Sequence, residues 1–265
     1  MTNPKIAVLF PVYNPGPELA ETLASIRDQS LPSRLFLIDD GSKRKPDYAP
    51  LIKGMDVHLI ELPKNQGIVG AMNAGLAEIL KGDFEFVARI DNGDINDLQR
   101  YQKQIAYLNA HPDLAFVGSH VRAEFRLNGL NFDFSFPETH EECLKTLRYN
   151  SAMAHGAIMY RMSFIRAFKA YTDKYPAAED YAMQQWAVAH GFRMGNVPES
   201  LYRAIELSDS ISANARGKQL WSRFRLQRDY ADWLNPHSYI GMARTLTLLA
   251  LPVTPLRVIK RLLSR

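Results

Sequence analysis

Short apolar runs alternate with helical patterns over the first third of this 265-residue chain. Four runs rich in Val, Ile, Leu and Phe have the length and composition of strands covered on both faces: Ile6–Phe10, Leu35–Ile38, Val57–Leu62 and Phe84–Ala88. Between them, residues 17–30 and 67–82 place their apolar side chains on one helical face. This alternation predicts an α/β fold with a mainly parallel sheet flanked by helices on both faces.

The pattern changes after Asn109. We expect further strands at 115–125 and 157–161 and helices at 138–149 and 179–190. Beyond Arg216 the sequence is helical, with interruptions at Asn235–Pro236, Pro252 and Pro255. With 46% hydrophobic residues the chain can bury a substantial core. We therefore predict one domain over residues 1–215 and a helical extension over residues 216–265.

Charge is concentrated in that extension, which holds ten Lys or Arg against two Asp, whereas the whole chain carries only +4. The distribution argues against nucleic-acid binding. It fits either an anionic membrane surface or an ordinary solvated helical face. A single cysteine, Cys143, excludes an internal disulfide and a cysteine-based zinc site. The most apolar stretch, 245–256, contains two prolines and is too short to span a bilayer, and no secretory signal is evident, so we expect a cytoplasmic or peripheral membrane protein.

Polar clusters follow three of the predicted strands. Pro11–Asn14 follows the first, Asp39–Ser42 the second, and Arg89–Asp94 the fourth. Ligands of open parallel sheets bind beyond the carboxyl ends of the strands, so these clusters should meet at one edge. Their aromatic, acidic and amide groups suit a ligand with a ring, hydroxyls and phosphates. A nucleotide has all three.

Six segments occur in an order that is more specific than any one of them: PVYN, LIDDGS, NQGIVGAMNAG, ARIDNGD, AEDYAMQQW and LYRAIELSDSIS. Over roughly residues 5–212 the chain resembles inverting family 2 glycosyltransferases with the GT-A fold, and it looks like bacterial enzymes that build surface polysaccharides. The resemblance implies a nucleotide-binding sheet, a nucleotide-sugar donor, and a saccharide or lipid-linked glycan as the acceptor.

The resemblance also implies a donor-binding set. Tyr13 matches a position near the nucleotide base, Asp40 the carboxylate that accepts hydrogen bonds from the base, and Asp91 the acid that meets the ribose. From local sequence alone, Asp40 is better explained as the cap of a turn at Gly41. The donor-binding residues implied are Pro11, Tyr13, Asn14, Asp40, Asn65, Gly67, Arg89, Asp91 and Asn92.

Two positions depart from the family pattern at the metal site. Gly93 replaces the acid that holds Mn²⁺ or Mg²⁺ in relatives, and Ile205 replaces a histidine that completes that site. One explanation is a shifted divalent-cation site at Asp91, Asp94 and Glu206. A second is neutralisation of the diphosphate without metal. The basic residues considered for that task are Arg89, Arg203, Arg216 and Lys218. A degenerate site is the third explanation.

Catalysis is assigned to the Glu-Asp pair in AAEDYAMQQW. Inverting transfer needs a general base that removes the proton of the acceptor hydroxyl. Asp180 matches that base in the family, and Glu179 would position it or bind the acceptor. Locally, two acids at the start of a helix would equally interact with the helix dipole. His155 and Asp94 are expected on the acceptor side.

These assignments predict an inverting glycosyltransferase that extends a saccharide of the cell envelope, such as a capsule or O-antigen. The departures at Gly93 and Ile205 leave open a non-catalytic, nucleotide-sugar-binding subunit of a polysaccharide-assembly complex. A nucleotidyltransferase is a further alternative, although the sequence lacks a glycine-rich phosphate loop followed by lysine near its start. A basic extension at a membrane surface would suit a lipid-linked acceptor.

Overall fold

A computed structural model describes residues 5–126, 129–206 and 216–251. Its strands are β1 Ile6–Val12, β2 Arg34–Asp39, β3 Asp56–Glu61, β4 Phe86–Arg89, β5 Ile95–Asn96, β6 Leu114–Phe125, β7 Leu130–Phe134, β8 Met159–Arg161 and β9 Arg193–Glu206. Its helices are α1 Glu18–Arg27, α2 Tyr48–Leu51, α3 Gly67–Ile79, α4 Arg100–Ala110, α5 His140–Leu147, α6 Met162–Phe168, α7 Glu179–Ala189, α9 Arg216–Asp229 and α10 Pro236–Ala250, with a 3₁₀ turn, η1, at His155–Ala157.

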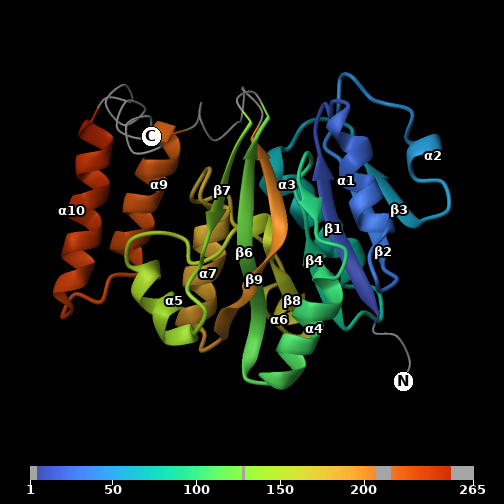
Figure 1. The fold of residues 1–265 in the computed structure, drawn as a ribbon. Helices are drawn as coiled ribbons and strands as arrows, with labels where there is room; N and C mark the ends of the chain where they lie inside the picture. The colour runs from blue at the N-terminus through green and yellow to red at the C-terminus, as the bar shows by residue number, and fades with distance from the viewer. Residues whose placement is uncertain (1–4, 127–128, 207–215, 252–265) are drawn as a thin grey trace.

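The strands form one sheet in the order β3-β2-β1-β4-β8-β6-β9-β5, and β7 pairs with β6 (Figure 1). The pairs within β1 to β4 are parallel. β6 and β9 run in the same direction as these strands, whereas β5, β7 and β8 run the opposite way. The predicted, mainly parallel sheet is thus confirmed, and its second half is mixed.

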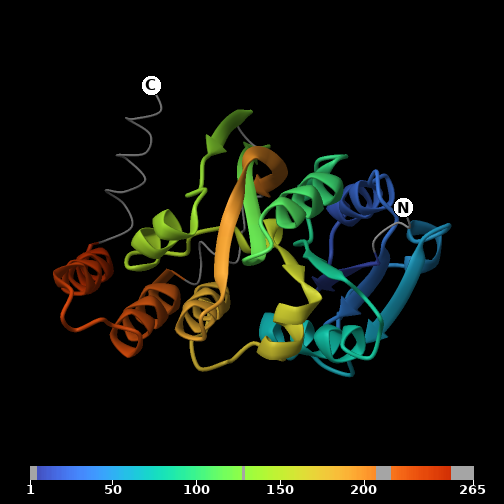
Figure 2. The ribbon, with the colours of Figure 1, turned by 90° about the horizontal axis from the view of Figure 1, so that it is seen from below.

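Helices cover both faces of the sheet, as Figure 2 shows. Alternate residues of β1 enter two different cores, with Leu9 in one and Val8 in the other. α3 contributes Leu76 to the first core, and α1 contributes Leu23 to the second. This double burial explains why the first strand reads as a continuous apolar run.

Three of the four strands predicted in the first third of the chain are buried. The fourth, β3, is a strand as predicted, but the expectation that it is covered on both faces is wrong: it lies at the edge of the sheet and is only partly buried. Its apolar residues are partly buried, with Ile60 packed against the first core and Val57 against the second.

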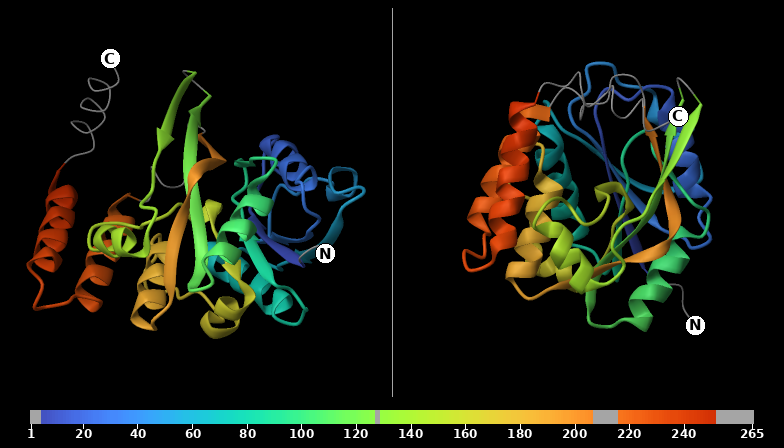
Figure 3. Two further views of the ribbon diagram at one scale, coloured as in Figure 1. Left: turned by 60° about the horizontal axis from the view of Figure 1, so that its bottom comes forward. Right: turned by 60° about the vertical axis from the view of Figure 1, so that its left-hand side comes forward.

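The C-terminal helices α9 and α10 lie side by side at one end of the molecule (Figure 3). Leu226 of α9 belongs to the core cluster that contains Tyr181 of α7. Gly241 of α10 lies so close to the carbonyl oxygen of Arg148 that no Cβ would fit there. Within the described ranges, no helix is long and apolar enough to cross a membrane.

Candidate active site

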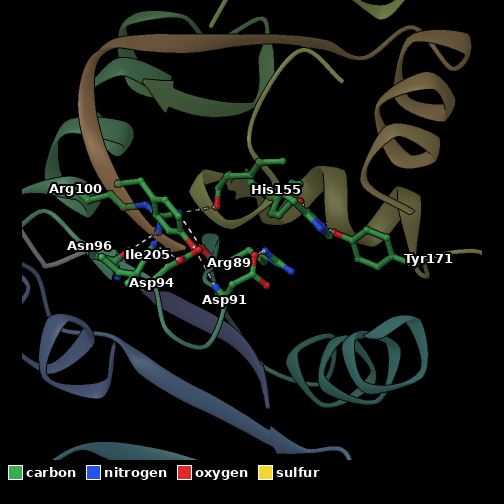
Figure 4. A network of polar contacts seen from close by, with 11 residues as sticks. Arg89, Asp91, Asp94, Asn96, Arg100, His155, Tyr171 and Ile205 are labelled. Atoms are coloured by element: carbon green, nitrogen blue, oxygen red, sulfur yellow. Dashed lines mark hydrogen bonds and ion pairs between the residues drawn. The ribbon is translucent and has the colours of Figure 1, made fainter. Parts of the chain in front are cut away.

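The segment after β4 turns back toward β9 at the carboxyl edge of the sheet (Figure 4). The hydroxyl of Tyr202 donates to Oδ2 of Asp94 at 2.7 Å and accepts from the backbone N–H of Asp91 at 3.1 Å. The backbone N–H of Ile205 donates to Oδ1 of Asp94 at 2.9 Å. Both carboxylate oxygens of Asp94 are therefore engaged in holding the 91–94 segment against β9.

Burial and the charge of Asp91 raise the pKa of Asp94 to about 7. Gly156 of η1 closes the other side of this cluster. A Cβ added there would lie 2.6 Å from Cζ of Tyr202 and 3.2 Å from Oδ2 of Asp91. A glycine is therefore needed for Tyr202 to reach between the two aspartates.

Gly93 occupies a turn whose backbone conformation favours glycine, since its φ is 94°. Its N–H donates to Oγ1 of Thr22 in α1 at 3.0 Å. The neighbouring Asn92 donates to Oε1 of Glu18 at 2.9 Å, and its own buried Oδ1 has no hydrogen-bond partner among the described residues. The position where the resemblance led us to expect a metal-binding acid thus forms a turn anchored on α1.

Arg89, the last residue of β4, is 2% exposed and forms an ion pair with Oδ2 of Asp91. Burial is the largest single influence and lowers the pKa of Arg89, but the charge of Asp91, the hydrogen bond to Asp91 and the nearby tyrosines together outweigh it, and the pKa is raised overall. The Nε atom of Arg89 has no partner within the described part of the chain. Arg89 is therefore a fixed positive charge beneath the segment that carries Asp91.

Glu179 and Asp180 begin helix α7, where the helix dipole favours negative charge. Burial and the charge of Asp180 raise the pKa of Glu179 to about 7, and the charge of Arg89 opposes that shift. Burial raises the pKa of Asp180, whereas the backbone N–H of Tyr181 and the charge of Arg89 lower it. The buried Oε2 atom of Glu179 has no hydrogen-bond partner among residues 5–126, 129–206 and 216–251. Its hydrogen-bonding capacity is therefore unused within the described part of the chain.

His155 lies in the wall of the same site (Figure 4). Its Nε2 atom is 3.0 Å from the hydroxyl of Tyr171, which lies 3.0 Å from the hydroxyl of Tyr160. Burial and the charge of Arg89 hold the pKa of His155 well below its usual range, so the imidazole is neutral. The two tyrosines were missed in the sequence, because no local pattern distinguishes them from core aromatic residues.

Asp40 joins the end of β2 to the loop before α3. Its Oδ2 accepts from Nδ2 of Asn65 at 3.0 Å, and its Oδ1 accepts from the backbone N–H of Gln66 at 2.7 Å. Burial raises the pKa of Asp40, and the N–H groups of Gln66 and Gly67 lower it. Both oxygens anchor this loop rather than the turn at Gly41. The side chain that caps that turn is Asp39, whose Oδ1 accepts from the backbone N–H of Ser42 at 2.8 Å, so the local interpretation of Asp40 as the turn cap is wrong.

Among the other predicted donor-binding residues, Tyr13 has an exposed side chain, whereas Asn14, Pro11 and Gly67 have roles in the local fold. Tyr13 is 41% exposed, so its ring is accessible at the end of β1. Oδ1 of Asn14 accepts from the backbone N–H groups of Lys43 and Arg44, at 2.8 and 3.0 Å. Pro11 is buried within β1. Gly67 begins α3 with a φ of 75°, again a conformation that favours glycine.

The described residues contain no group of three or more His, Cys, Asp or Glu that could hold a metal ion. Asp94 is engaged as described above, and the side chain of Glu206 lies outside the described part of the chain. Oδ2 of Asp91 pairs with Arg89, and the Asp91 side chain is 43% exposed. The described residues alone do not supply a complete cation site there.

The basic residues considered as a substitute for metal do not converge on this cluster. Arg203 donates to Oε1 of Glu124 at 3.1 Å on the outer face of β6 and β9. Arg216 donates to the carbonyl oxygen of Leu248 at 2.7 Å and so caps the end of α10. Lys218 is exposed on α9. Of these four residues, only Arg89 lies beside Asp91 and Asp94.

A sequence model described as "Glycosyl transferase family 2" matches residues 7–169, more than half of the chain. The chain belongs to glycosyltransferase family 2. It is 30% identical to the putative glycosyltransferase EpsE of Bacillus subtilis (strain 168), over 79% of this chain and 76% of that protein. It is 26% identical to an Escherichia coli protein named UDP-Gal:alpha-D-GlcNAc-diphosphoundecaprenol beta-1,3-galactosyltransferase, over 75% of this chain and 73% of that protein.

An uncharacterized glycosyltransferase of Haemophilus influenzae is 29% identical over 65% of this chain, which spans 64% of that relative. Among solved structures, S. aureus TarS 1-349 in complex with UDP-GlcNAc has a TM-score of 0.64 and 18% identity, covering 91% of this chain and 71% of that one. The mannosyltransferase PcManGT of Pyrobaculum calidifontis, solved with GDP-Man and Mn²⁺, has a TM-score of 0.61 and 17% identity, covering 99% and 81%. These likenesses confirm the predicted GT-A fold.

Proposed function

We propose that this glycosyltransferase moves a sugar, with inversion, from a nucleotide-sugar to a hydroxyl of a saccharide or lipid-linked glycan of the cell envelope. The observation that carries the proposal is the pair Glu179 and Asp180 at the start of α7, buried near Arg89 and Asp91 beyond the end of β4. The names of the relatives and of the solved structures support a sugar nucleotide as donor. A cytoplasmic site of action follows from such a donor and acceptor.

In this proposal Asp180 is the general base. Burial raises its pKa, which makes the carboxylate a stronger base than an exposed aspartate. Glu179 presents the unpartnered Oε2 atom, which accepts a hydrogen bond from a sugar hydroxyl. Asp91 meets the ribose, and His155, as a neutral imidazole, binds on the acceptor side.

Charge favours a divalent cation bound together with the donor. The cluster contains the carboxyl groups of Asp91, Asp94, Glu179 and Asp180. Against them stand the buried guanidinium groups of Arg89 and Arg100 and the charge of Arg223, which acts on Asp180. Carboxyl groups therefore outnumber guanidinium groups around a bound diphosphate. Mg²⁺ commonly takes one or two protein carboxylates and fills its other positions with phosphate oxygens and water. Oδ1 of Asp91 would hold such an ion, which would neutralise the charge of the departing diphosphate.

Two measurements on the full-length protein test the function. Thermal unfolding with nucleoside mono- and diphosphates, each in EDTA, Mg²⁺ or Mn²⁺, identifies the base and any need for a cation, since a ligand of the folded state raises Tm. Donor turnover is then compared for wild type, Asp180→Asn and the control Asp173→Asn, an exposed aspartate nearby. We expect Asp180→Asn to bind the donor and to lose turnover at least about a hundredfold. Turnover within twofold of wild type would exclude Asp180 as the base, and release of pyrophosphate would indicate a nucleotidyltransferase instead.

A membrane surface is the proposed location of the acceptor. The loop between α9 and α10 exposes Trp233 and Leu234, at 53% and 96%, and the outer face of α10 exposes Tyr239, Ile240 and Leu246. Aromatic and aliphatic side chains together with a basic extension suit an anionic bilayer surface. Flotation with phosphatidylglycerol vesicles should recover the wild type and lose the Trp233→Ala/Leu234→Ala variant. The control is Leu98→Ala, also an exposed leucine but located between β5 and α4, and equal flotation of all three proteins would contradict this location.

A further inference from the structure

The loop of residues 169–178 leads directly into Glu179 and Asp180. Lys169 and Ala177, near its two ends, have φ values of 63° and 60°, which are unfavourable for residues other than glycine. Such conformations persist where surrounding contacts hold them in place. The contacts of this loop therefore determine where the two catalytic carboxyl groups lie.

Helix α9 holds one end of the loop. Oδ2 of Asp229 accepts from the hydroxyl of Tyr175 at 2.7 Å and from Nζ of Lys174 at 2.9 Å. The ring of Tyr175 is buried in the core, and the guanidinium of Arg225 lies 5.6 Å from its centre. The carbonyl of Tyr175 accepts from the N–H of Ala178, the residue before Glu179, at 3.1 Å. A short chain of contacts thus links Asp229 to the start of α7.

Helix α3 holds the other end. Oδ1 of Asn73 accepts from the N–H of Tyr171 at 2.8 Å, and its Nδ2 donates to the carbonyl of Tyr171 at 2.9 Å. The hydroxyl of Tyr171 contacts His155 in the site. The loop is therefore fixed from two opposite directions, by a helix of the nucleotide-binding half and by a helix of the C-terminal extension.

We propose that Asp229 is a positioning residue for sugar transfer, which fixes loop 169–178 through Tyr175 and Lys174 and so directs Asp180 toward the acceptor. The proposal rests on the proposed function, because it assumes that Asp180 acts in transfer. Asp229 lies beyond residues 7–169, where the family model matches, so the extension contributes to the site something that this match does not contain.

Loss of the hydrogen bonds to Asp229 should affect the loop far more than the fold. Lys174 is half exposed in its pair with Asp229, whereas α9 stays attached through Leu226 in the core and through Gln227, which donates to the carbonyl of Arg148 at 3.2 Å. The charge of Arg223, also on α9, lowers the pKa of Asp180 against the raising effect of burial, in keeping with α9 lying close to the base. Asp229→Asn is therefore suited to separate a positioning role from a role in folding.

Hydrogen exchange measured by mass spectrometry tests the loop without any substrate. Four full-length proteins are compared: wild type, Asp229→Asn, Tyr175→Phe and the control Asp113→Asn. Asp113, in the connection between α4 and β6, accepts from Nε of Arg193 at the start of β9 at 2.9 Å. This exposed pair has the same kind of hydrogen bond to a carboxylate but does not involve loop 169–178. Because a hydrogen bond to a charged group is removed, we expect peptides covering 169–178 to exchange about tenfold faster in both loop variants and unchanged in the control. Unchanged exchange in Asp229→Asn would overturn the proposal.

Kinetics with the donor identified above test the catalytic consequence. We expect kcat to fall roughly tenfold in Asp229→Asn while KM for the donor stays within about twofold, since a displaced base affects the chemical step. Asp229→Glu, which keeps the acceptor, should recover part of kcat. Faster exchange with unchanged kcat would show that Asp229 orders the loop without positioning the base, and would refute the catalytic role. A wild type that turns over no donor would instead refute the proposed function, while the exchange result still stands.

Discussion

Replacement of Gly156 by alanine should break the hydrogen-bond cluster that holds Asp91 and Asp94. The added Cβ would lie 2.6 Å from Cζ of Tyr202 and closer still to its hydroxyl oxygen. Tyr202 has no room to withdraw, since it is 2% exposed and the guanidinium of Arg100 lies 5.2 Å from its ring centre. The hydroxyl would therefore be displaced from Asp94 and from the N–H of Asp91.

The size of the effect is set by the packing and the two hydrogen bonds that the added methyl group would disrupt. Overpacking of a close-packed site costs about 1–3 kcal/mol. Breaking the bond from Tyr202 to the carboxylate of Asp94 costs about 1.5–3 kcal/mol, and breaking the bond from the N–H of Asp91 about 1 kcal/mol. We expect Gly156→Ala to lower the free energy of unfolding by about 4 kcal/mol, which for a chain of this size corresponds to a Tm lower by roughly 10 °C.

Urea denaturation and thermal unfolding at pH 8, where Asp94 is ionised, measure this effect. Gly217→Ala is the matched control, because a Cβ at Gly217 in α9 meets nothing within 4 Å. Alanine there should raise the free energy of unfolding by up to about 1 kcal/mol. The double variant Gly156→Ala/Tyr202→Phe should lose less free energy of unfolding than the two single variants together, because it lacks the Tyr202 hydroxyl oxygen, the atom nearest to the added Cβ. A free energy of unfolding for Gly156→Ala that is within about 1 kcal/mol of the wild-type value would refute this account of the packing around Tyr202.

Two further predictions concern pH. Burial and the charge of Asp180 raise the pKa of Glu179 to about 7, so Asp180→Asn should lower the pKa of Glu179, measured by NMR titration of its carboxyl group; an unchanged pKa would argue against coupling of the two groups. In the folded protein Asp94 keeps its proton up to about pH 7, whereas the unfolded chain loses it near its ordinary pKa of 3.8. The free energy of unfolding should therefore fall as pH rises between about 4 and 7, by up to about 1.4 kcal/mol per pH unit, and Asp94→Asn should flatten this slope in urea denaturation with EDTA. Equal slopes in the two proteins would contradict that account.

The sequence predicts the nucleotide-binding half of the fold well, because β1, β2 and β4 are buried strands and therefore carry a continuous apolar run. It does not predict β9, which contains Gly195, Pro198 and several charged residues. That strand is specified by its long pairing with β6, which includes shifts in register. Such pairing depends on residues distant in the sequence, so no local pattern reveals it.

Some residues of the candidate site could likewise be predicted from the sequence, and others could not. The order of the segments points to Arg89, Asp91, Glu179 and Asp180, and the structure brings these residues within range of one another's charges. Tyr202 could not be predicted, because its role depends on Asp94, 108 positions away in the chain.

The same limit applies to the glycine opposite Tyr202. The requirement for Gly156 depends on the position of that tyrosine ring. Neither Gly156 nor Tyr202 belongs to a sequence pattern that indicates a role in the site, and the role of each becomes visible only in the folded structure.

The extension connects two proposals that the sequence alone keeps apart. In the proposed arrangement Trp233, Leu234 and the outer face of α10 meet a membrane surface, and α9 holds loop 169–178 through Asp229. The two helices are joined by a hydrogen bond of 2.8 Å from Oγ1 of Thr245 to Oε1 of Gln227. A lipid-linked acceptor would then approach from the side of the molecule whose helices also hold the loop before Asp180. Because contact with the bilayer and placement of the base depend on one pair of helices, the base would face an acceptor that the membrane itself brings into position.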